Sequence, residues 1–316
     1  MRIFHGLGEV PADFGPSVVT IGNFDGVHIG HREIMRRVTT IARERGLAAT
    51  VLTFDPHPAR ILAPDRAPRL IMTMGQRLRQ FEAAGIDAVL LLPFSFEFAR
   101  LTPDEFAAGV LANTLRARCV LVGEDFRFGY KQAGNIDTLR AEGERLGFEV
   151  QPVAAINGRI GRISSSAIRS LIAEGRVSRA CRLMGGRFAL EGAVVGGQGI
   201  GSKKTVPTLN LAPENELLPK TGVYATRTRD EASQCQWRSI TNVGYRPTFD
   251  GHTLTVETFL LDPPPATAPD RIEVCFLTFV REERRFATPE QLREQILRDI
   301  GVTNRFHRRL AGLHVG

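Results

Sequence analysis

The sequence predicts two domains of different class: an α/β domain with a parallel sheet over residues 1–185, and an antiparallel β domain with a terminal helix over residues 186–316. The first prediction rests on apolar runs that alternate with segments of helical period, because parallel strands need crossover connections. The second rests on short β-branched runs separated by Gly, Pro, Asn and Asp, which are typical of a barrel or a sandwich. A length of 316 residues also exceeds the size at which a single core usually stops growing.

Helical segments separate the expected strands of the first domain. Apolar residues from Ile34 to Ala42 recur at helical spacing and stop before Gly46, a residue type that often caps helix ends. A second helix is marked by Leu78, Phe81 and Ala84 and closed by Gly85, and a third opens at the capping box Thr102–Glu105. A further helix is expected before residue 148. The expected strands cover residues 18–21, 49–54, 87–92, 119–122 and 148–153.

The second domain begins where the spacing changes near Gly185, and the joint is expected in the helix and turn over residues 171–186. Its expected strands cover residues 190–195, 222–228, 237–243, 253–261 and 272–279. An amphipathic helix follows Pro289, with Leu292 and Ile296 on its apolar face.

The charge balance selects no class of partner by itself. The chain carries 41 Lys and Arg against 34 Asp and Glu, a net charge of +7. No basic block is interleaved with aromatic residues, so we expect no nucleic-acid binding. No apolar run approaches the roughly 20 residues of a membrane helix, and the N-terminus has no signal-peptide pattern. We therefore expect a cytoplasmic protein without membrane contacts.

The four cysteines are far apart and form no CxxC pair. We expect reduced core residues rather than a disulfide framework or a zinc site. They are Cys119, Cys181, Cys235 and Cys275.

The most informative segment runs from Gly22 to His31 (GNFDGVHIGH), where the first expected strand ends and the first helix begins. Ligands of open α/β sheets bind at the carboxyl ends of strands, and a helix N-terminus favours anions. His28 and His31 flank Gly30, so a phosphate can approach the backbone and receive hydrogen bonds from both imidazoles. The alternative is a turn with incidental histidines, which we disfavour because two of only seven histidines fall here.

A second polar segment (ISSSAIR) lies at an expected helix start near the end of the first domain. One hydroxyl among Ser164, Ser165 and Ser166 would serve as an ordinary N-cap. Three hydroxyls together with Arg169 exceed what a cap needs and fit the binding of a triphosphate.

The second domain carries its own polar set. The loop over residues 196–204 (GGQGIGSKK) is able to bring backbone N–H groups to phosphates, although such a loop is also consistent with a plain hairpin. Thr208 and Asn210 stand two residues apart on one strand face and offer hard oxygen ligands suited to Mg²⁺. Glu257 places one carboxylate in an apolar β run, where a surface-facing Glu is the competing interpretation.

The pairing of GNFDGVHIGH with ISSSAIR resembles the FMN adenylyltransferase domain of the bacterial bifunctional riboflavin kinase/FAD synthetase family. Residues 53–58 (TFDPHP) and 123–129 (GEDFRFG) match the same family, which usually has Thr where Ser166 stands. The letters HIGH are also similar to class I aminoacyl-tRNA synthetases, but those need a KMSKS-type loop that is not visible here.

This resemblance implies a Rossmann-like nucleotidylyltransferase domain in which His28 and His31 assist attack on the ATP α-phosphate. The residues that it places at the ATP phosphates are Gly22, Asn23, Phe24, Asp25, Gly30, Ser164, Ser165, Ser166 and Arg169. The residues that it places at the flavin are Pro56, His57, Pro58, Asp125, Phe126 and Phe128. Phe126 and Phe128 are equally consistent with core positions.

The polar set of the second domain resembles the riboflavin kinase family, a small closed barrel with a C-terminal helix. The resemblance implies that Thr208 and Asn210 bind Mg²⁺ and nucleotide, and that Glu257 is the base for the ribityl hydroxyl. It places the nucleotide also at Gly199, Gly201 and Lys203. The sequence departs from the family in three places: PTAN is PTLN here, the usual Gly-Phe before it is Thr205-Val206, and the preceding Gly-rich loop is altered.

Together the two resemblances cover nearly the whole chain. They imply ATP-dependent phosphorylation of riboflavin to FMN, and adenylylation of FMN to FAD with release of pyrophosphate. Riboflavin, FMN and ATP are then the small-molecule substrates, and Mg²⁺ is the metal. Two alternatives stay open, a nucleotidylyltransferase for another phosphate substrate and a nucleic-acid-binding regulator on the same fold; self-association stays open as well.

Overall fold

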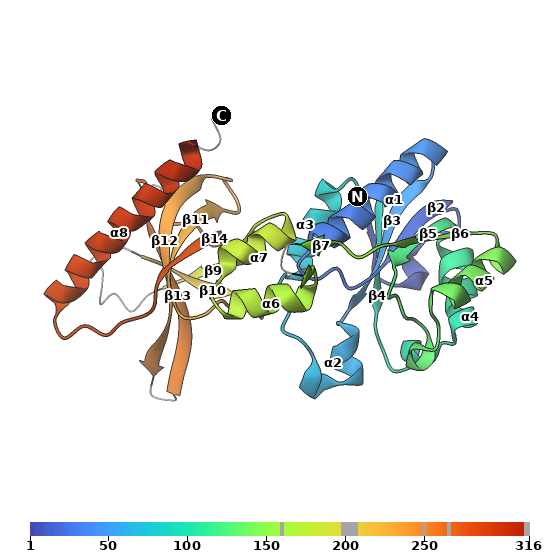
Figure 1. Ribbon diagram of the computed structural model, residues 1–316, viewed down its shortest axis with the longest axis horizontal. Coiled ribbons are helices and arrows are strands. Elements are labelled where there is room, and N and C mark those ends of the chain that lie inside the picture. Colours follow the sequence, from blue (N-terminus) through green and yellow to red (C-terminus); the bar gives the residue numbers. More distant parts are fainter. Residues whose placement is uncertain (159–160, 197–207, 249–250, 264–266, 313–316) are drawn as a thin grey trace. The chain divides into compact units, whose positions relative to one another are not determined.

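The computed structural model describes residues 1–158, 161–196, 208–248, 251–263 and 267–312, and it divides into two compact units (Figure 1). The first unit contains Met1–Arg69 and Met74–Ser164, and the second contains Leu70–Thr73 and Ser165–Gly316. Each unit has a sheet of its own class, which confirms the predicted fold.

The first unit is built on a six-stranded parallel sheet in the order β1-β4-β3-β2-β5-β6. Its strands are β1 (Arg2–Phe4), β2 (Ser17–Ile21), β3 (Ala48–Asp55), β4 (Ala88–Pro93), β5 (Ala117–Gly123) and β6 (Glu149–Val153). The five expected strands are confirmed. The structure adds the edge strand β1, whose three residues are too few to display a period.

Neighbouring residues within the central strands of this sheet are buried together. Val18 and Val19 on β2 are both 0% exposed, and Val89 and Leu90 on β4 are as well. Successive side chains of a strand point to opposite faces, so both faces of the sheet are covered.

The helices of the first unit are α1 (Ile29–Arg45), α2 (Pro58–Leu62), α3 (Met74–Ala83), α4 (Pro103–Phe106) and α5 (Ile136–Leu146). Helix α1 ends at Gly46 in the left-handed conformation, with φ 66°, and α4 opens with the predicted capping box between Thr102 and Glu105. A π-helical segment, Ala107–Thr114, continues α4. The shorter elements are four 3-10 turns (Leu7–Glu9, Pro64–Arg66, Phe98–Arg100 and Tyr130–Gln132) and the antiparallel pair β7 (Asn157–Gly158) and β8 (Gly161–Arg162).

The second unit contains a closed barrel in the order β10-β13-β12-β11-β14-β9, with antiparallel neighbours. Its strands are β9 (Phe188–Val195), β10 (Leu209–Pro213), β11 (Gly222–Asp230), β12 (Gln236–Thr248), β13 (Gly251–Leu260) and β14 (Arg271–Arg281). The barrel, rather than the sandwich, is therefore correct. Strand β10 had no range among the expected strands, because its five residues end in a proline and lack β-branched residues, but its position agrees with the strand face expected for Thr208 and Asn210.

A chain of buried hydroxyls lies inside the barrel. The Thr226 hydroxyl bonds to those of Ser239 and Thr241 at 2.8 Å each, and Thr241 bonds to Thr258 at 2.9 Å. All four residues are 0% exposed, so these polar groups satisfy one another. Because side chains alternate along a strand, the residues next to Thr241 and Thr258 point to the outside of the barrel.

The described residues of the second unit form the helices α6 (Ser165–Ala173), α7 (Val177–Met184) and α8 (Pro289–Gly312). Helix α7 packs against β9 and β14, and the Phe188 backbone N–H donates to Cys181 Sγ at 3.3 Å. Helix α8 lies along the outside of the barrel (Figure 1). An ion pair between Arg281 and Asp299, 2.7 Å apart and largely buried, fixes α8 to β14.

A short piece of the N-terminal sequence is part of the second unit. This strap (residues 70–73) is bonded to residues around β9 and β10: Asn215 Nδ2 donates to the Ile71 carbonyl at 3.2 Å, and Thr73 Oγ1 donates to Glu191 Oε1 at 2.5 Å. Ile71 is 0% exposed. The strap leads directly into α3 of the first unit, so the chain passes between the units more than once.

The cysteine prediction holds for three residues and fails for one. All four are free thiols; Cys119 and Cys275 are buried and Cys181 is half-buried. Cys235 is exposed, so its expected core position is wrong. It lies in the turn between β11 and β12, where no sheet face is available to cover it.

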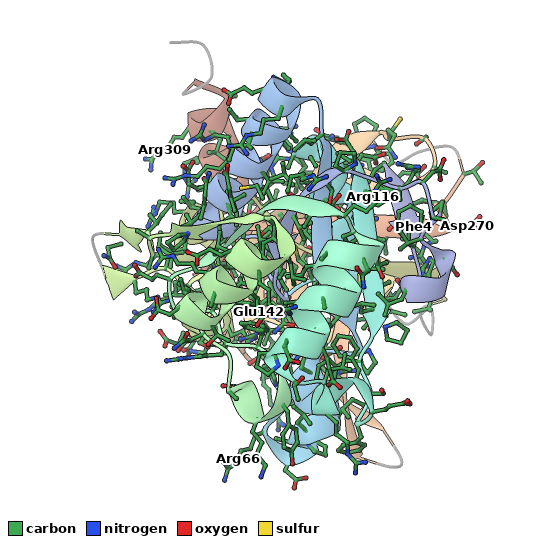
Figure 2. All side chains as sticks on the ribbon, turned by 90° about the vertical axis from the view of Figure 1, so that its right-hand side faces the viewer. Phe4, Arg66, Arg116, Glu142, Asp270 and Arg309 are labelled. Atoms are coloured by element: carbon green, nitrogen blue, oxygen red, sulfur yellow. The ribbon has the colours of Figure 1, made fainter. Side chains whose placement is uncertain are left out.

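Charged side chains of the first unit lie on separate elements. Figure 2 shows Arg66 after α2, Arg116 before β5 and Glu142 on α5. Within the described residues, no helix combines the length and apolar character that crossing a membrane requires.

Candidate active sites

The turn between β2 and α1 carries the GNFDGVHIGH residues on a tightly wound backbone. The Gly22 N–H donates to the Leu52 carbonyl at 3.1 Å, which ties the turn to β3. Phe24 and Val27 have positive φ angles of 48° and 34°, which non-glycine residues seldom adopt. Such backbone strain is concentrated at functional sites and needs support from its surroundings.

His28 and His31 stack on each other at the start of α1. Their ring centroids are 3.6 Å apart and their planes differ by 14°. His28 is the N-cap, and its Nδ1 accepts a hydrogen bond from the His31 backbone N–H at 3.3 Å. A neutral imidazole has one donor and one acceptor nitrogen, so Nε2 of His28 carries the proton and is a hydrogen-bond donor.

Gly30 makes the close ring position possible. A methyl group at Gly30 would lie 3.1 Å from Cε1 and 3.2 Å from Nδ1 of His28. Any larger residue would push the imidazole away from the helix start. This is a steric reason for the glycine in the HxGH pattern.

Burial keeps both imidazoles uncharged. It lowers the pKa of His28 to about 4, to which the positive charge of Arg162 contributes. It lowers the pKa of His31 well below its usual value, and the neighbouring His28 adds to this effect. Nδ1 of His31 is buried and has no hydrogen-bond partner among the described residues. The donor that the pair offers is therefore Nε2–H of His28.

Two side chains hold the backbone of Asn23. Arg77 on α3 is 3% exposed and donates from Nη1 to the Asn23 carbonyl at 3.0 Å. The Thr53 hydroxyl approaches the same oxygen at 3.5 Å. Phe24 is 2% exposed and packs edge-on against Phe81 of α3, so its side chain serves packing. Asp25 is also buried, at 2% exposed.

The predicted flavin residues lie in two segments of the first unit, one where β3 leads into α2 and one after β5. His57 is the N-cap of α2, where its Nδ1 accepts from the Ala59 N–H at 3.1 Å, between Pro56 and Pro58. Asp125 forms an exposed ion pair with Arg162 at 2.6 Å. These positions leave their role with flavin a prediction.

Phe126 and Phe128 stack in parallel, with centroids 5.4 Å apart. Phe128 is 7% exposed and contacts Phe106 in the core, while Phe126 is partly buried at the edge of the same cluster. An unbroken series of aromatic contacts continues from Phe106 through Phe98 to Phe54 and Phe94. Phe128 therefore has a packing role whatever its role with flavin.

The ISSSAIR hydroxyls flank the start of α6 in the second unit. Ser164 precedes the helix, Ser165 is its first residue, Ser166 is exposed and Arg169 is half-buried one turn later. Their role at the ATP phosphates stays a prediction. Gly199, Gly201 and Lys203 lie outside the described residues.

Three polar side chains form a row on the outer face of the barrel. Asn210 on β10 lies opposite Glu257 on β13, and Glu257 lies opposite Asn242 on β12. Residues directly opposite in antiparallel strands have neighbouring side chains on one face. The structure thus brings Asn210 and Glu257 together as predicted, and Thr208 immediately precedes β10. Glu257 is half-buried on this outer face, and its role as a base stays a prediction.

Asn210 offers an oxygen that suits a hard cation. Its Oδ1 is buried and has no hydrogen-bond partner among the described residues. Amide and hydroxyl oxygens are ligands that Mg²⁺ accepts alongside phosphate oxygens. In the part of the chain that the structure describes, no cluster of three or more His, Cys, Asp or Glu forms a separate metal site.

Comparison with known proteins covers both halves of the chain. A family model described as FAD synthetase matches residues 10–167, and one described as riboflavin kinase matches residues 184–307. The bifunctional riboflavin kinase/FMN adenylyltransferase of Escherichia coli (strain K12) is 34% identical over 299 residues, which cover 95% of each chain. The chain belongs to the bifunctional riboflavin kinase/FMN adenylyltransferase family.

Other relatives cover the same length. The bifunctional riboflavin kinase/FMN adenylyltransferase of Haemophilus influenzae is 31% identical over 306 residues, covering 97% of this chain and 99% of the relative. A crystal structure described as a macrolide-efflux protein from Streptococcus pneumoniae has a TM-score of 0.86 at 29% identity, covering 96% and 98% of the two chains. As a riboflavin kinase/FMN adenylyltransferase, the chain uses ATP to convert riboflavin to FMN and FMN to FAD.

Sequence patterns did not single out three residues that lie near these sites. Helical spacing gave a weak indication for Arg77, because this charged residue stands four positions before Phe81 and therefore falls on the buried face of α3. Arg162 had none, because its effect on His28 depends on tertiary structure. Asn242 had no signal of its own, because its place opposite Glu257 follows only from strand register.

Proposed function

We propose that residues 1–185 carry the FMN adenylyltransferase activity at the His28–His31 turn, and that residues 186–316 carry the riboflavin kinase activity at the Glu257 face of the barrel. The ranges of the two family models support this division. We further propose that both reactions take place in the cytoplasm, where ATP is available.

The observation that supports the adenylyl-transfer site best is the pair of stacked, uncharged imidazoles at the start of α1. A phosphate oxygen of FMN attacks the α-phosphorus of ATP, a new P–O bond forms, and the bond to pyrophosphate breaks. Negative charge develops on the non-bridging oxygens of the α-phosphate. Nε2–H of His28 donates to that charge, and the helix N-terminus adds to its stabilisation. No covalent intermediate on the protein is needed.

The kinase site depends on the row of Asn210, Glu257 and Asn242. Glu257 accepts the proton of the terminal ribityl hydroxyl. The oxygen of that hydroxyl attacks the γ-phosphorus of ATP, and the bond between this phosphorus and the ADP leaving group breaks. Asn210 Oδ1 and the Thr208 hydroxyl would hold Mg²⁺, which neutralises phosphate charge when bound. Asn242 flanks Glu257 on the other side and is able to orient its carboxylate by donating a hydrogen bond.

Two assays on the full chain test this division. One measures FMN formed from riboflavin and ATP, and the other measures FAD formed from supplied FMN and ATP. We expect His28→Ala to abolish most FAD formation and to spare FMN formation, and Glu257→Gln to do the opposite. Equal loss of both activities in either folded variant contradicts the assignment of one reaction to each site.

A further inference from the structure

A second carboxylate rests on the outer face of the barrel beside the proposed kinase residues. Gly244 on β12 is two positions from Asn242 and lies opposite Thr255 on β13. A methyl group at Gly244 would lie 2.2 Å from Glu283 Oε1 and 3.0 Å from Asn242 Nδ2. The Glu283 carboxylate therefore occupies the space that a side chain at position 244 would fill, next to the Asn242 amide.

Gly244, where the Glu283 carboxylate lies, is joined to Glu257 through the Thr255 hydroxyl. The Thr255 hydroxyl approaches the Gly244 carbonyl at 3.3 Å and Glu257 Oε1 at 3.5 Å. Two residues along a strand span about 7 Å. Gly244 lies opposite Thr255, two positions from Glu257, so the Glu283 carboxylate lies on the same outer face as Glu257 and is displaced from it along the strand.

The strand register places Glu283 on the side of Glu257 away from the proposed nucleotide residues. Asn210 lies opposite Glu257, and β10 runs antiparallel to β13. Thr208 consequently lies on the Phe259 side of Glu257 along β13. Thr255 and Gly244 lie on the opposite side of Glu257. Glu257 lies between the metal and nucleotide donors and the Glu283 carboxylate.

In an in-line transfer, the nucleophile approaches the phosphorus from the side opposite the leaving group. The body of riboflavin must therefore extend away from ATP, which is the side of Glu283. Ionised carboxylates only accept hydrogen bonds, and they repel phosphates. A neutral polyol with several O–H donors is a fitting ligand. We propose that Glu283 binds the ribityl chain by accepting a hydrogen bond from one of its secondary hydroxyls. This inference rests on the proposed kinase site at Glu257.

The test compares Glu283→Ala with Glu282→Ala in the full chain. Glu282 is the adjacent residue, carries the same charge and pairs with Lys220 on the surface at 2.8 Å, so it is a matched control. We expect Glu283→Ala to raise the KM for riboflavin about tenfold or more, with kcat and the KM for ATP unchanged. Lumiflavin, which has the ring system without the ribityl chain, serves as a competitive inhibitor. Its inhibition constant should stay within about twofold of wild type.

A second variant, Gly244→Ala, introduces the methyl group that displaces the Glu283 carboxylate, and the same rise in KM for riboflavin is expected. The proposal is overturned if Glu283→Ala behaves as Glu282→Ala does. It is also overturned if riboflavin and lumiflavin weaken equally, since that result indicates a role in folding or ring binding. Glu257→Gln is assayed in parallel. If it loses turnover while Glu283→Ala matches its control, only this inference fails; if Glu257→Gln is active, the proposed kinase site itself fails.

Discussion

His31 donates its backbone N–H to Nδ1 of His28, and the two imidazole rings lie face to face 3.6 Å apart. One residue therefore sets the tautomer of the other. The donor that points away from the protein backbone is Nε2–H of His28.

The first prediction follows from this donor. His28→Ala and His31→Ala should each lower FAD formation from FMN by on the order of 10²- to 10³-fold, because a positioned donor to developing phosphate charge is lost. FMN formation from riboflavin should stay near wild type. His5→Ala is the control, since His5 is exposed on the same unit. FAD synthesis that persists in a folded double variant contradicts the role of the pair.

The second prediction concerns pH and stability. The pKa of His28 is lowered from 6.5 to about 4, so between these values the unfolded chain binds a proton that the folded chain does not. Stability should therefore fall as pH falls from 6.5 toward 4, by on the order of 3 kcal/mol for this residue. Denaturant unfolding of wild type and His28→Gln at several pH values measures the difference. Identical pH dependence of the two proteins contradicts the lowered pKa.

The third prediction separates base from metal ligand in the kinase site. Glu257→Gln should lower kinase turnover by roughly 10²- to 10⁴-fold with little change in nucleotide affinity, because it removes a proton acceptor. Thr208→Ala should instead raise the concentration of Mg²⁺-ATP needed for half-maximal rate, because it removes an oxygen ligand. Both should leave FAD formation from FMN nearly untouched. A Glu257→Gln turnover within about threefold of wild type, at saturating riboflavin and ATP, would show that Glu257 is not the base.

The fourth prediction concerns thiol reactivity. Cys235 is exposed, whereas burial raises the pKa of Cys119 to about 11 and that of Cys275 to about 12. Thiolates are the reactive form, so one thiol should react rapidly with a disulfide reagent in the native protein. Cys235→Ser should abolish the rapid phase. Denaturant should then expose the remaining thiols, and a rapid phase that survives in Cys235→Ser would contradict the burial of the others.

The fifth prediction concerns fragments of the second unit. A fragment of residues 186–316 lacks α7, whose Val177, Ala180 and Met184 are buried, and it also lacks α6. Removing such helices exposes apolar surface of β9 and β14. A fragment of residues 165–316 should therefore unfold at a higher temperature than 186–316. Scanning calorimetry of the two fragments measures this, and equal midpoints would show that α6 and α7 do not stabilise the barrel.

Local signals explain what was predictable from the sequence. Gly46 and the capping box at Thr102 fix helix ends through contacts within a few residues, so both were found. The HxGH turn was predicted because all of its polar residues lie within ten consecutive positions of the sequence. Glu257 and Asn210 were named separately, because the register that pairs them arises only when β10 lies beside β13, far along the chain.

Interactions between residues far apart in the chain could not be predicted from the sequence. The lowered pKa of His28 arises from burial and from Arg162, more than a hundred positions away in the chain. Arg77 supports Asn23 from another helix. Glu283 reaches Gly244 from the segment after β14, and no pattern within either strand indicates that approach.

The strap has a consequence for exchanging parts between relatives. Ile71 and Thr73 bond to Asn215 and Glu191, which stand far along the chain and beyond residue 165. A hybrid made with a single crossover at residue 165 would combine the strap of one parent with the barrel residues of the other. Such hybrids should fold well only when residues 70–73 are transferred together with the barrel. The second unit is therefore encoded by two separate stretches of the gene, and both must come from the same parent.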